Sequence, residues 1–144
     1  MTQSHFRFLP DIALADIAYA ATADSPSALF ETCADALTSA MVDRRTLRSR
    51  LTQELKLEAE TQDGLLYDFL TRIIVLKDVD SLLFRRFMVD VSKNGRSLRC
   101  TMTGEHIDRE RQALRNDVKA VTMHMFGIRR GKSGSWEATI VLDI

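Results

Sequence analysis

Two segments of the chain carry apolar residues at the spacing of a helix. Ser25 and Pro26, a capping hydroxyl followed by proline at the first helical position, begin a helix predicted over about residues 26–41, whose apolar residues share one face. After Thr61, apolar residues recur in adjacent pairs four positions apart, which predicts a second helix over about 63–76. Each helix therefore has one apolar stripe to bury.

The other apolar residues alternate with polar ones or lie in β-rich runs, as is typical of strands. Strands are predicted over residues 4–9, 16–21, 55–59, 82–91, 97–102, 118–128 and 136–143. Asn94-Gly95 between two of these runs predicts a β-hairpin, because both residues accept positive φ. We therefore expect an α+β fold in which two helices pack on a mainly antiparallel sheet.

Length and charge narrow the class of protein. A chain of 144 residues falls within the roughly 100–200 residues of one domain, so we expect a single domain over 1–144. Twenty basic and twenty acidic residues cancel, which argues against a protein whose whole surface binds nucleic acid. Local basic clusters remain candidates for steering RNA or an acidic protein surface: Arg44, Arg45, Arg48 and Arg50, and Arg129, Arg130 and Lys132.

The cysteines and the hydropathy indicate a cytoplasmic protein. Cys33 and Cys100 lack metal-type spacing and lie in apolar-periodic segments, so we expect reduced thiols in the core. No run approaches the ~18 apolar residues of a membrane span, and the first residues do not resemble an export signal. We expect neither membrane insertion nor export.

Acidic residues at the chain's end carry the clearest chemical signal, since the standard catalytic motifs are absent from the sequence. Asp143 closes the last predicted strand, so its carboxylate lies beside the C-terminal carboxylate of Ile144. Adjacent anions repel unless a cation joins them, and Ca²⁺ or Mg²⁺ takes such oxygen ligands. Asp16 would add a third carboxylate if its strand neighbours the last one. The alternative is a terminal aspartate that simply faces solvent.

Several segments together resemble one known family. They are the run NDVKAVTMH at 116–124, the tail VLDI at 141–144, the helix LLYDFL at 65–70, and ADI at 15–17 followed by Phe30 in a helix. These segments are similar to the archease family across essentially the whole chain. The family's D-H-T-A-D segment differs here, since residues 10–16 read PDIALAD, two residues longer and without His-Thr.

The resemblance implies an α+β fold with a strand-helix-strand-strand module and an accessory, non-enzymatic function. Archeases bind a divalent metal and activate an RtcB-type RNA ligase, promoting its guanylylation by GTP and its multiple turnover in tRNA splicing or RNA repair. The implied metal ligands are Asp16, Asp143 and the terminal carboxylate of Ile144, with Asp11 as a further candidate. RNA would be engaged only indirectly, through the ligase.

Three further residues in the resembling segment are candidates for contacting the partner. Lys119, Asp117 and His124 lie in or near the predicted strand 118–128. The structural alternatives are a solvent-facing lysine, an exposed residue at a strand start and a packed histidine.

Two other classes of function stay open. One is a metal-dependent hydrolase of a small phosphorylated substrate, which would also gather carboxylates but would need a positioned base. The other is a stand-alone RNA-binding adaptor, which would need a basic face interleaved with stacking aromatics.

Overall fold

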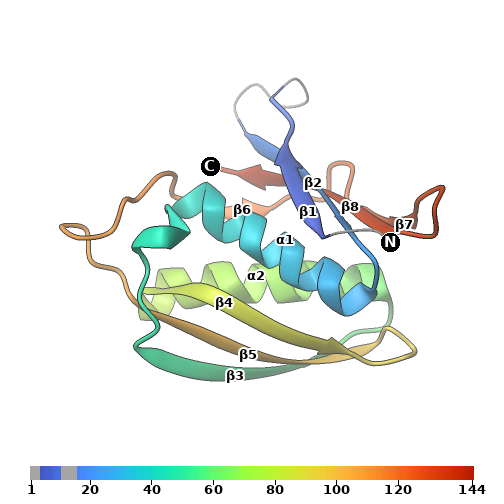
Figure 1. Ribbon diagram of the computed structural model, residues 1–144, viewed down its shortest axis with the longest axis horizontal. Helices are drawn as coiled ribbons and strands as arrows, with labels where there is room; N and C mark the ends of the chain where they lie inside the picture. Colours follow the sequence, from blue (N-terminus) through green and yellow to red (C-terminus); the bar gives the residue numbers. More distant parts are fainter. Residues whose placement is uncertain (1–3, 11–15) are drawn as a thin grey trace.

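The computed structural model describes residues 4–10 and 16–144 (Figure 1). The elements in these residues are β1 (His5–Phe8), β2 (Ile17–Ala23), α1 (Pro26–Met41), the 3₁₀ helix η1 (Arg44–Thr46), β3 (Leu51–Glu58), α2 (Gln62–Asp80), β4 (Leu82–Val91), β5 (Ser97–His106), β6 (Ala120–Val121), β7 (Gly127–Arg130) and β8 (Trp136–Asp143). The α+β class is confirmed.

The strands form two sheets, and both helices lie between them (Figure 1). One sheet has the order β1-β2-β8-β6, with β7 also pairing with β8, and the other has the order β3-β5-β4. Each of these strand pairs is antiparallel. Helices α1 and α2 each contact strands of both sheets. The architecture thus differs from the predicted single sheet, because a second sheet covers the helices from the other side.

Local capping chemistry determines where the helices begin. Ser25 Oγ accepts a hydrogen bond from the Ala28 amide at 3.1 Å, and α1 has the predicted bounds. Thr61 caps α2 in the same way. Helix α2 continues four residues past the predicted end, to Asp80, and its cap residue Ser81 adopts a left-handed φ of 55°.

The core joins the helices to both sheets. Phe30 of α1 stacks on Phe69 of α2 with 6.0 Å between ring centroids. Tyr19 of β2 is fully buried and donates a hydrogen bond to the carbonyl of Cys33 at 3.0 Å. Both Cys33 and Cys100 are buried and unbridged, as predicted, and burial raises the pKa of each thiol. These thiols are therefore core residues.

Two strand predictions were wrong in detail. The predicted strand 118–128 is divided into β6 and β7, which pair with different parts of β8. The segment between β6 and β7 has three more residues than the part of β8 between their partners, so it cannot continue as a regular strand. Met125 in the intervening turn has φ 56°. In the β4–β5 hairpin, Gly95 has a positive φ of 73°, whereas the φ of Asn94 is not positive. The Asn94 side chain instead accepts a hydrogen bond from the Arg96 amide. The loop is accordingly longer than a two-residue turn.

Candidate metal and partner site

Antiparallel pairing brings the first predicted metal ligands to one edge of the five-stranded sheet. Ile17 of β2 pairs with Leu142 of β8, which confirms that these strands are neighbours. Continued by one residue, the register sets Asp16 opposite Asp143. Residues opposite each other in such a pair have Cβ atoms about 4.5–5.5 Å apart and side chains on the same face. The pairing thus brings residues 16 and 143 to the same end of these two strands.

The backbone of Asp143 is held from its other side by β6. Ala120 pairs with Asp143, and the Lys119 amide donates to the Asp143 carbonyl at 2.8 Å. Leu142 is fully buried, whereas Asp143 is exposed. Burial of one neighbour therefore anchors the strand while the Asp143 carboxylate faces water.

The donor set at this edge fits a hard divalent cation. Asp16 is half-buried and borders a hollow of about 380 Å³, where Ile17 and Ala40 supply apolar walls. In the described ranges 4–10 and 16–144, no three His, Cys, Asp or Glu side chains gather closely enough to hold a metal ion. The third predicted ligand, at Ile144, is a main-chain carboxylate and not a side chain, and Asp11 lies outside the described residues. Oxygen donors alone suit Ca²⁺ or Mg²⁺.

Asp117 has a structural partner that the sequence did not reveal. Its Oδ1 lies 2.5 Å from Nζ of Lys77, and the hydrogen bond from Lys77 lowers the pKa of Asp117. The Lys77 side chain is only 7% exposed and also donates to the Val118 carbonyl at 2.6 Å and pairs with Asp78 at 3.0 Å. Lys77 thus fastens the segment before β6 to helix α2.

A sequence signal for Lys77 did exist. It lies four residues after Ile73, on the stripe of α2 that is buried, so a cation there requires an anion or carbonyl partner. That partner comes from a segment forty residues away in the chain. Helical spacing therefore identifies the buried lysine but not Asp117.

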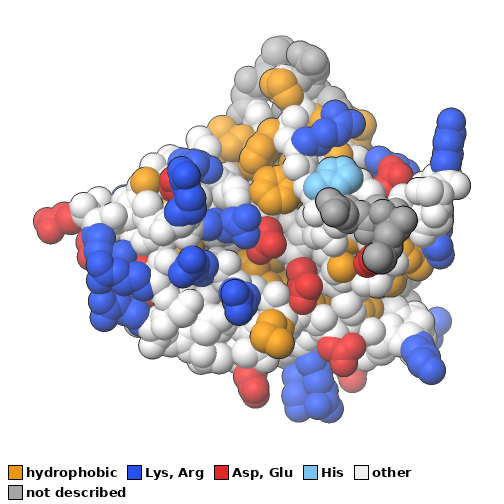
Figure 2. Space-filling model, in the orientation of Figure 1, with side chains coloured by type: hydrophobic (Ala, Val, Ile, Leu, Met, Phe, Trp, Pro, Cys, Tyr) orange, Lys and Arg blue, Asp and Glu red, His pale blue; other side chains and the backbone are white. Residues whose placement is uncertain are grey.

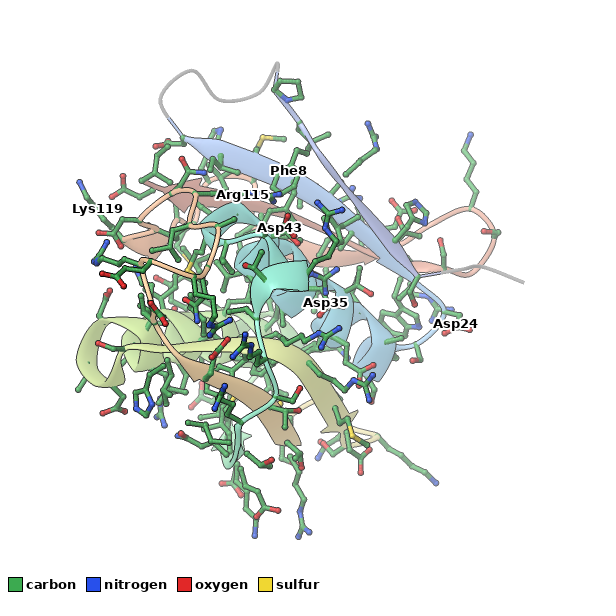
Figure 3. The ribbon with its side chains drawn as sticks, turned by 60° about the vertical axis from the view of Figure 1, so that its left-hand side comes forward. Phe8, Asp24, Asp35, Asp43, Arg115 and Lys119 are labelled. Carbon is green, nitrogen blue, oxygen red and sulfur yellow. The ribbon has the colours of Figure 1, made fainter. Side chains whose placement is uncertain are left out.

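Lys119 and His124 both lie on the surface. Lys119 is exposed, as expected for a solvent-facing lysine. Figure 3 shows Lys119 and Asp24, the residue after β2, on opposite sides of the molecule. His124 is not packed: it is exposed in the turn between β6 and β7, flanked by Met123 and Met125, which are 68% and 51% exposed. The expected strand position of His124 was wrong because the chain bulges there.

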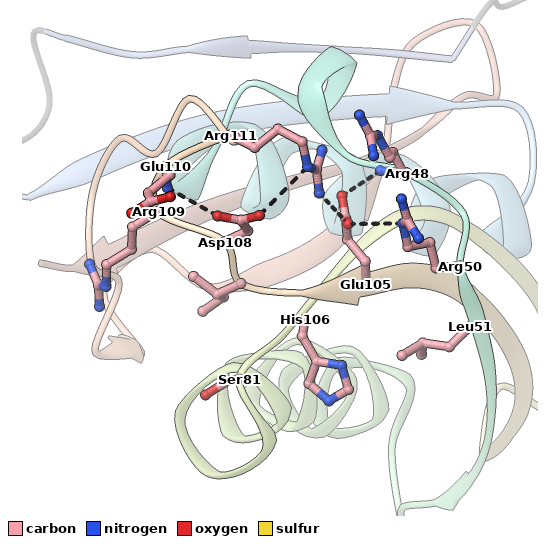
Figure 4. A pocket seen from close by; sticks show the side chains of 11 residues that line it. Arg48, Arg50, Leu51, Ser81, Glu105, His106, Asp108, Arg109, Glu110 and Arg111 are labelled. Carbon is pink, nitrogen blue, oxygen red and sulfur yellow. Dashed lines mark hydrogen bonds and ion pairs between the residues drawn. The ribbon is translucent and has the colours of Figure 1, made fainter.

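A second polar cluster, unrecognised in the sequence, lies at the end of β5 (Figure 4). Glu105 is buried and accepts hydrogen bonds from the Arg48 amide at 2.7 Å and from the Arg111 guanidinium. Nε of Arg50 lies 3.8 Å from its Oε1. The hydrogen bond from Arg111 holds the pKa of the Glu105 carboxyl well below its usual range, at about 2. A charged Glu105 therefore organises arginines from two separate segments.

No helix in the described part of the chain is long and apolar enough to cross a membrane.

Comparison with known proteins identifies the family. The model of the Archease protein family matches residues 6–144. Protein archease of Pyrococcus abyssi is 34% identical over 132 residues, which cover 90% of this chain and 93% of that protein. Protein archease of Methanopyrus kandleri is 34% identical over 134 residues, or 90% and 94% of the two chains.

Solved structures agree with these relatives. The solution structure of a Methanobacterium thermoautotrophicum protein superposes with a TM-score of 0.78 at 27% identity, covering 96% of this chain and 98% of that one. The crystal structure of an archease from Thermotoga maritima has the same fold, with a TM-score of 0.62 at 21% identity over 92% and 93% of the chains. With a family match over nearly its whole length, the chain belongs to the archease family.

Proposed function

We propose that this chain is a metal-binding accessory protein that activates an RtcB-type RNA ligase. It would promote guanylylation of the ligase and its multiple turnover, without catalysing ligation itself. Membership of the archease family supports this function, and the T. maritima archease is named as a possible chaperone, which points to a protein partner. The observation that carries the proposal is the register that sets Asp16 opposite Asp143.

The acidic edge, defined as Asp16, Asp143 and the carboxylate at Ile144, would hold the cation. A bound Ca²⁺ or Mg²⁺ would supply positive charge for phosphate oxygens in the ligase's nucleotide pocket. Asp143 is exposed at the end of its strand, so its carboxylate can approach a partner. Pairing with β2 on one side and β6 on the other keeps its backbone in place during that approach. Electrostatic placement of this kind lowers the cost of gathering like charges.

Lys119 would contact the partner beside the cation. Its amide donates to the Asp143 carbonyl and its side chain is exposed. A lysine whose backbone is held against Asp143 would add positive charge near the acidic edge and would help to orient the approaching ligase. His124 and Asp117 flank it as weaker candidates, because Asp117 already pairs with Lys77.

Multiple-turnover RNA ligation tests this proposal. The assay contains the ligase from the same source, GTP, a divalent metal and RNA ends bearing a 3′-phosphate and a 5′-hydroxyl. Wild-type protein should raise product well above one turnover per ligase, and Asp143→Asn should not. Asp90→Asn is the matched control, since Asp90 is an exposed carboxylate on β4 of the other sheet. Equal stimulation by both variants contradicts the proposal, and release of phosphate by the protein alone would favour the hydrolase.

A further inference from the structure

Arginines crowd the end of the molecule where α1 leads into η1. Four line one hollow of about 450 Å³ and four line a second of about 920 Å³: Arg44, Arg45, Arg85 and Arg115 in the first, and Arg48, Arg50, Arg109 and Arg111 in the second. Figure 2 shows Lys and Arg side chains gathered at the left-hand end of the molecule. Because the whole chain has no net charge, this arginine face is a local feature.

The two hollows border the same short helix. Arg44 and Arg45 of η1 line the first hollow. Arg111, which lines the second, donates to the carbonyl of Thr46, the last residue of η1, at 3.0 Å. The arginine face is therefore continuous across η1.

Four of these guanidinium groups have no carboxylate within ion-pair distance among the residues described, and one of the four, that of Arg115, donates to the Ser39 carbonyl at 2.8 Å. The other three belong to Arg48, Arg85 and Arg109, all exposed. By contrast, Arg44 pairs with Asp35 at 3.0 Å. The unpaired guanidinium groups remain able to bind an external anion, and a guanidinium fork matches the geometry of a phosphate.

The buried Glu105 organises the larger hollow before any ligand arrives. It bonds the Arg48 amide and the Arg111 side chain, with Arg50 nearby (Figure 4). Chain segments around Arg48 and Arg111 are thereby held together. Holding groups in place in advance reduces the entropy lost when a ligand binds.

An apolar hollow with an exposed aromatic ring adjoins the arginines. Arg115 and Ser39 line both the first arginine hollow and the hollow of about 380 Å³ that includes Phe8. The Phe8 side chain is 41% exposed. Figure 3 shows Phe8, Arg115 and Asp43 following one another along one side of the molecule. A cationic surface beside an exposed aromatic ring is typical of proteins that bind single-stranded nucleic acid.

We propose that the arginine face binds single-stranded RNA directly, with phosphates on the arginines and a base against Phe8. This inference rests on the proposed function for the choice of RNA over other polyanions. It replaces the expectation that the protein meets RNA only through the ligase. Since Asp16 borders the same hollow as Phe8, an RNA bound here would run toward the acidic edge.

Fluorescence anisotropy with a labelled twelve-nucleotide oligouridine tests the proposal without any ligase. The variant R48Q/R85Q/R109Q removes only arginines that lack a carboxylate partner, and K56Q/R72Q/K93Q removes the same charge from exposed sites elsewhere. We expect the arginine variant to bind at least about tenfold more weakly and to lower the slope of log K against log salt by about 2, since each single-strand phosphate contact contributes about 0.7. The control variant should stay within about twofold of wild type.

Phe8→Leu separates stacking from charge. It keeps an apolar side chain against Tyr19, whose ring centroid lies 6.0 Å from that of Phe8. We expect about fivefold or greater loss of affinity with an unchanged salt slope. Thermal unfolding of each variant excludes a loss of fold as the cause.

Three results would overturn the proposal. They are no binding by the wild type, equal losses in the two triple variants, and tighter binding of poly-L-glutamate than of RNA at matched charge, which would assign the face to an acidic protein. Ligase activation is measured separately, as guanylylation without RNA. Failure of RNA binding therefore leaves the proposed function standing, and failure of activation leaves the RNA measurement interpretable.

Discussion

The ammonium nitrogen of Lys77 lies 2.5 Å from Oδ1 of Asp117, across the groove between helix α2 and the segment that leads into β6. Lys77 is almost completely buried, whereas the Asp117 side chain is 82% exposed. The buried Lys77 needs Asp117 and the Val118 carbonyl as hydrogen-bond acceptors, because water cannot reach it. The exposed Asp117 can bind water in place of the lysine. The Lys77–Asp117 contact therefore connects α2 to the segment that contains Lys119 and pairs with Asp143.

This asymmetry predicts unequal costs for the two partners. Lys77→Met should lower the free energy of unfolding by about 1–3 kcal/mol, because the Val118 carbonyl loses its donor in a buried place. Asp117→Asn should cost less than about 1 kcal/mol, because the Asn side-chain oxygen can still accept from Lys77, which also keeps the Val118 carbonyl and Asp78 as partners. Urea denaturation measures both. Equal costs would show that the pair acts as a buried unit and would contradict this account.

The lowered pKa of Glu105 predicts a loss of stability in acid. Its pKa falls from the ordinary 4.5 to about 2 in the folded protein. The folded state therefore favours the charged form, so its contribution is complete above about pH 4.5 and is lost as the pH falls toward 2. Between pH 6 and pH 3, chemical denaturation should show a shallower decline for Glu105→Gln than for the wild type. Parallel curves would count against the Arg111–Glu105 interaction.

Gly104 predicts a steric limit inside the three-stranded sheet. A Cβ atom there would lie 2.0 Å from the Leu83 carbonyl oxygen, next to the β-bulge between Phe84 and Arg86. Gly104→Ala should destabilise the fold by about 3 kcal/mol or more, because backbone must move. At Gly127 the nearest atom would be 3.6 Å from the new Cβ, so Gly127→Ala is the matched control. A thermal melt compares them, and similar melting temperatures would contradict the prediction.

Local chemistry in the sequence predicted the helices well. The bounds of α1 follow from Ser25 and Pro26, and both cysteines are buried as the apolar periodicity indicated. The two sheets could not be predicted, because alternation along a strand shows that one face is buried but not which partner covers it. The division of the strand 118–128 was not predicted for a related reason. Met123 and Met125 count as apolar in the pattern but are exposed in a turn.

The site could be predicted only in part. The pairing of β2 with β8, which the predicted approach of Asp16 to Asp143 required, is observed, whereas their binding of a metal ion stays a prediction. Glu105 was missed because its two partners come from different loops, Arg48 from a segment 57 residues away and Arg111 from the loop that follows β5. Arg85 reaches the arginine face from a third segment, so no run of sequence contains that surface.

Direct metal titration gives a separate prediction for the acidic edge. Isothermal titration with Ca²⁺ or Mg²⁺ should show binding by the wild type that weakens about tenfold or more in Asp16→Asn and in Asp143→Asn, because each removes an anionic oxygen ligand. A Gly-Ser extension after Ile144 should weaken it as well, since the terminal carboxylate then moves away. Unchanged binding in all three proteins would show that the cation, if bound, lies elsewhere.

If the acidic edge activates the ligase, the rate of ligase guanylylation must depend on Asp143. Radiolabelled GTP, a divalent metal and the RtcB-type ligase are mixed without RNA, and covalent label on the ligase is followed over time. We expect wild-type protein and Asp90→Asn to accelerate labelling at least about tenfold, while folded Asp143→Asn leaves the rate at that of the ligase alone. Equal acceleration by Asp143→Asn and the wild type would contradict the claim.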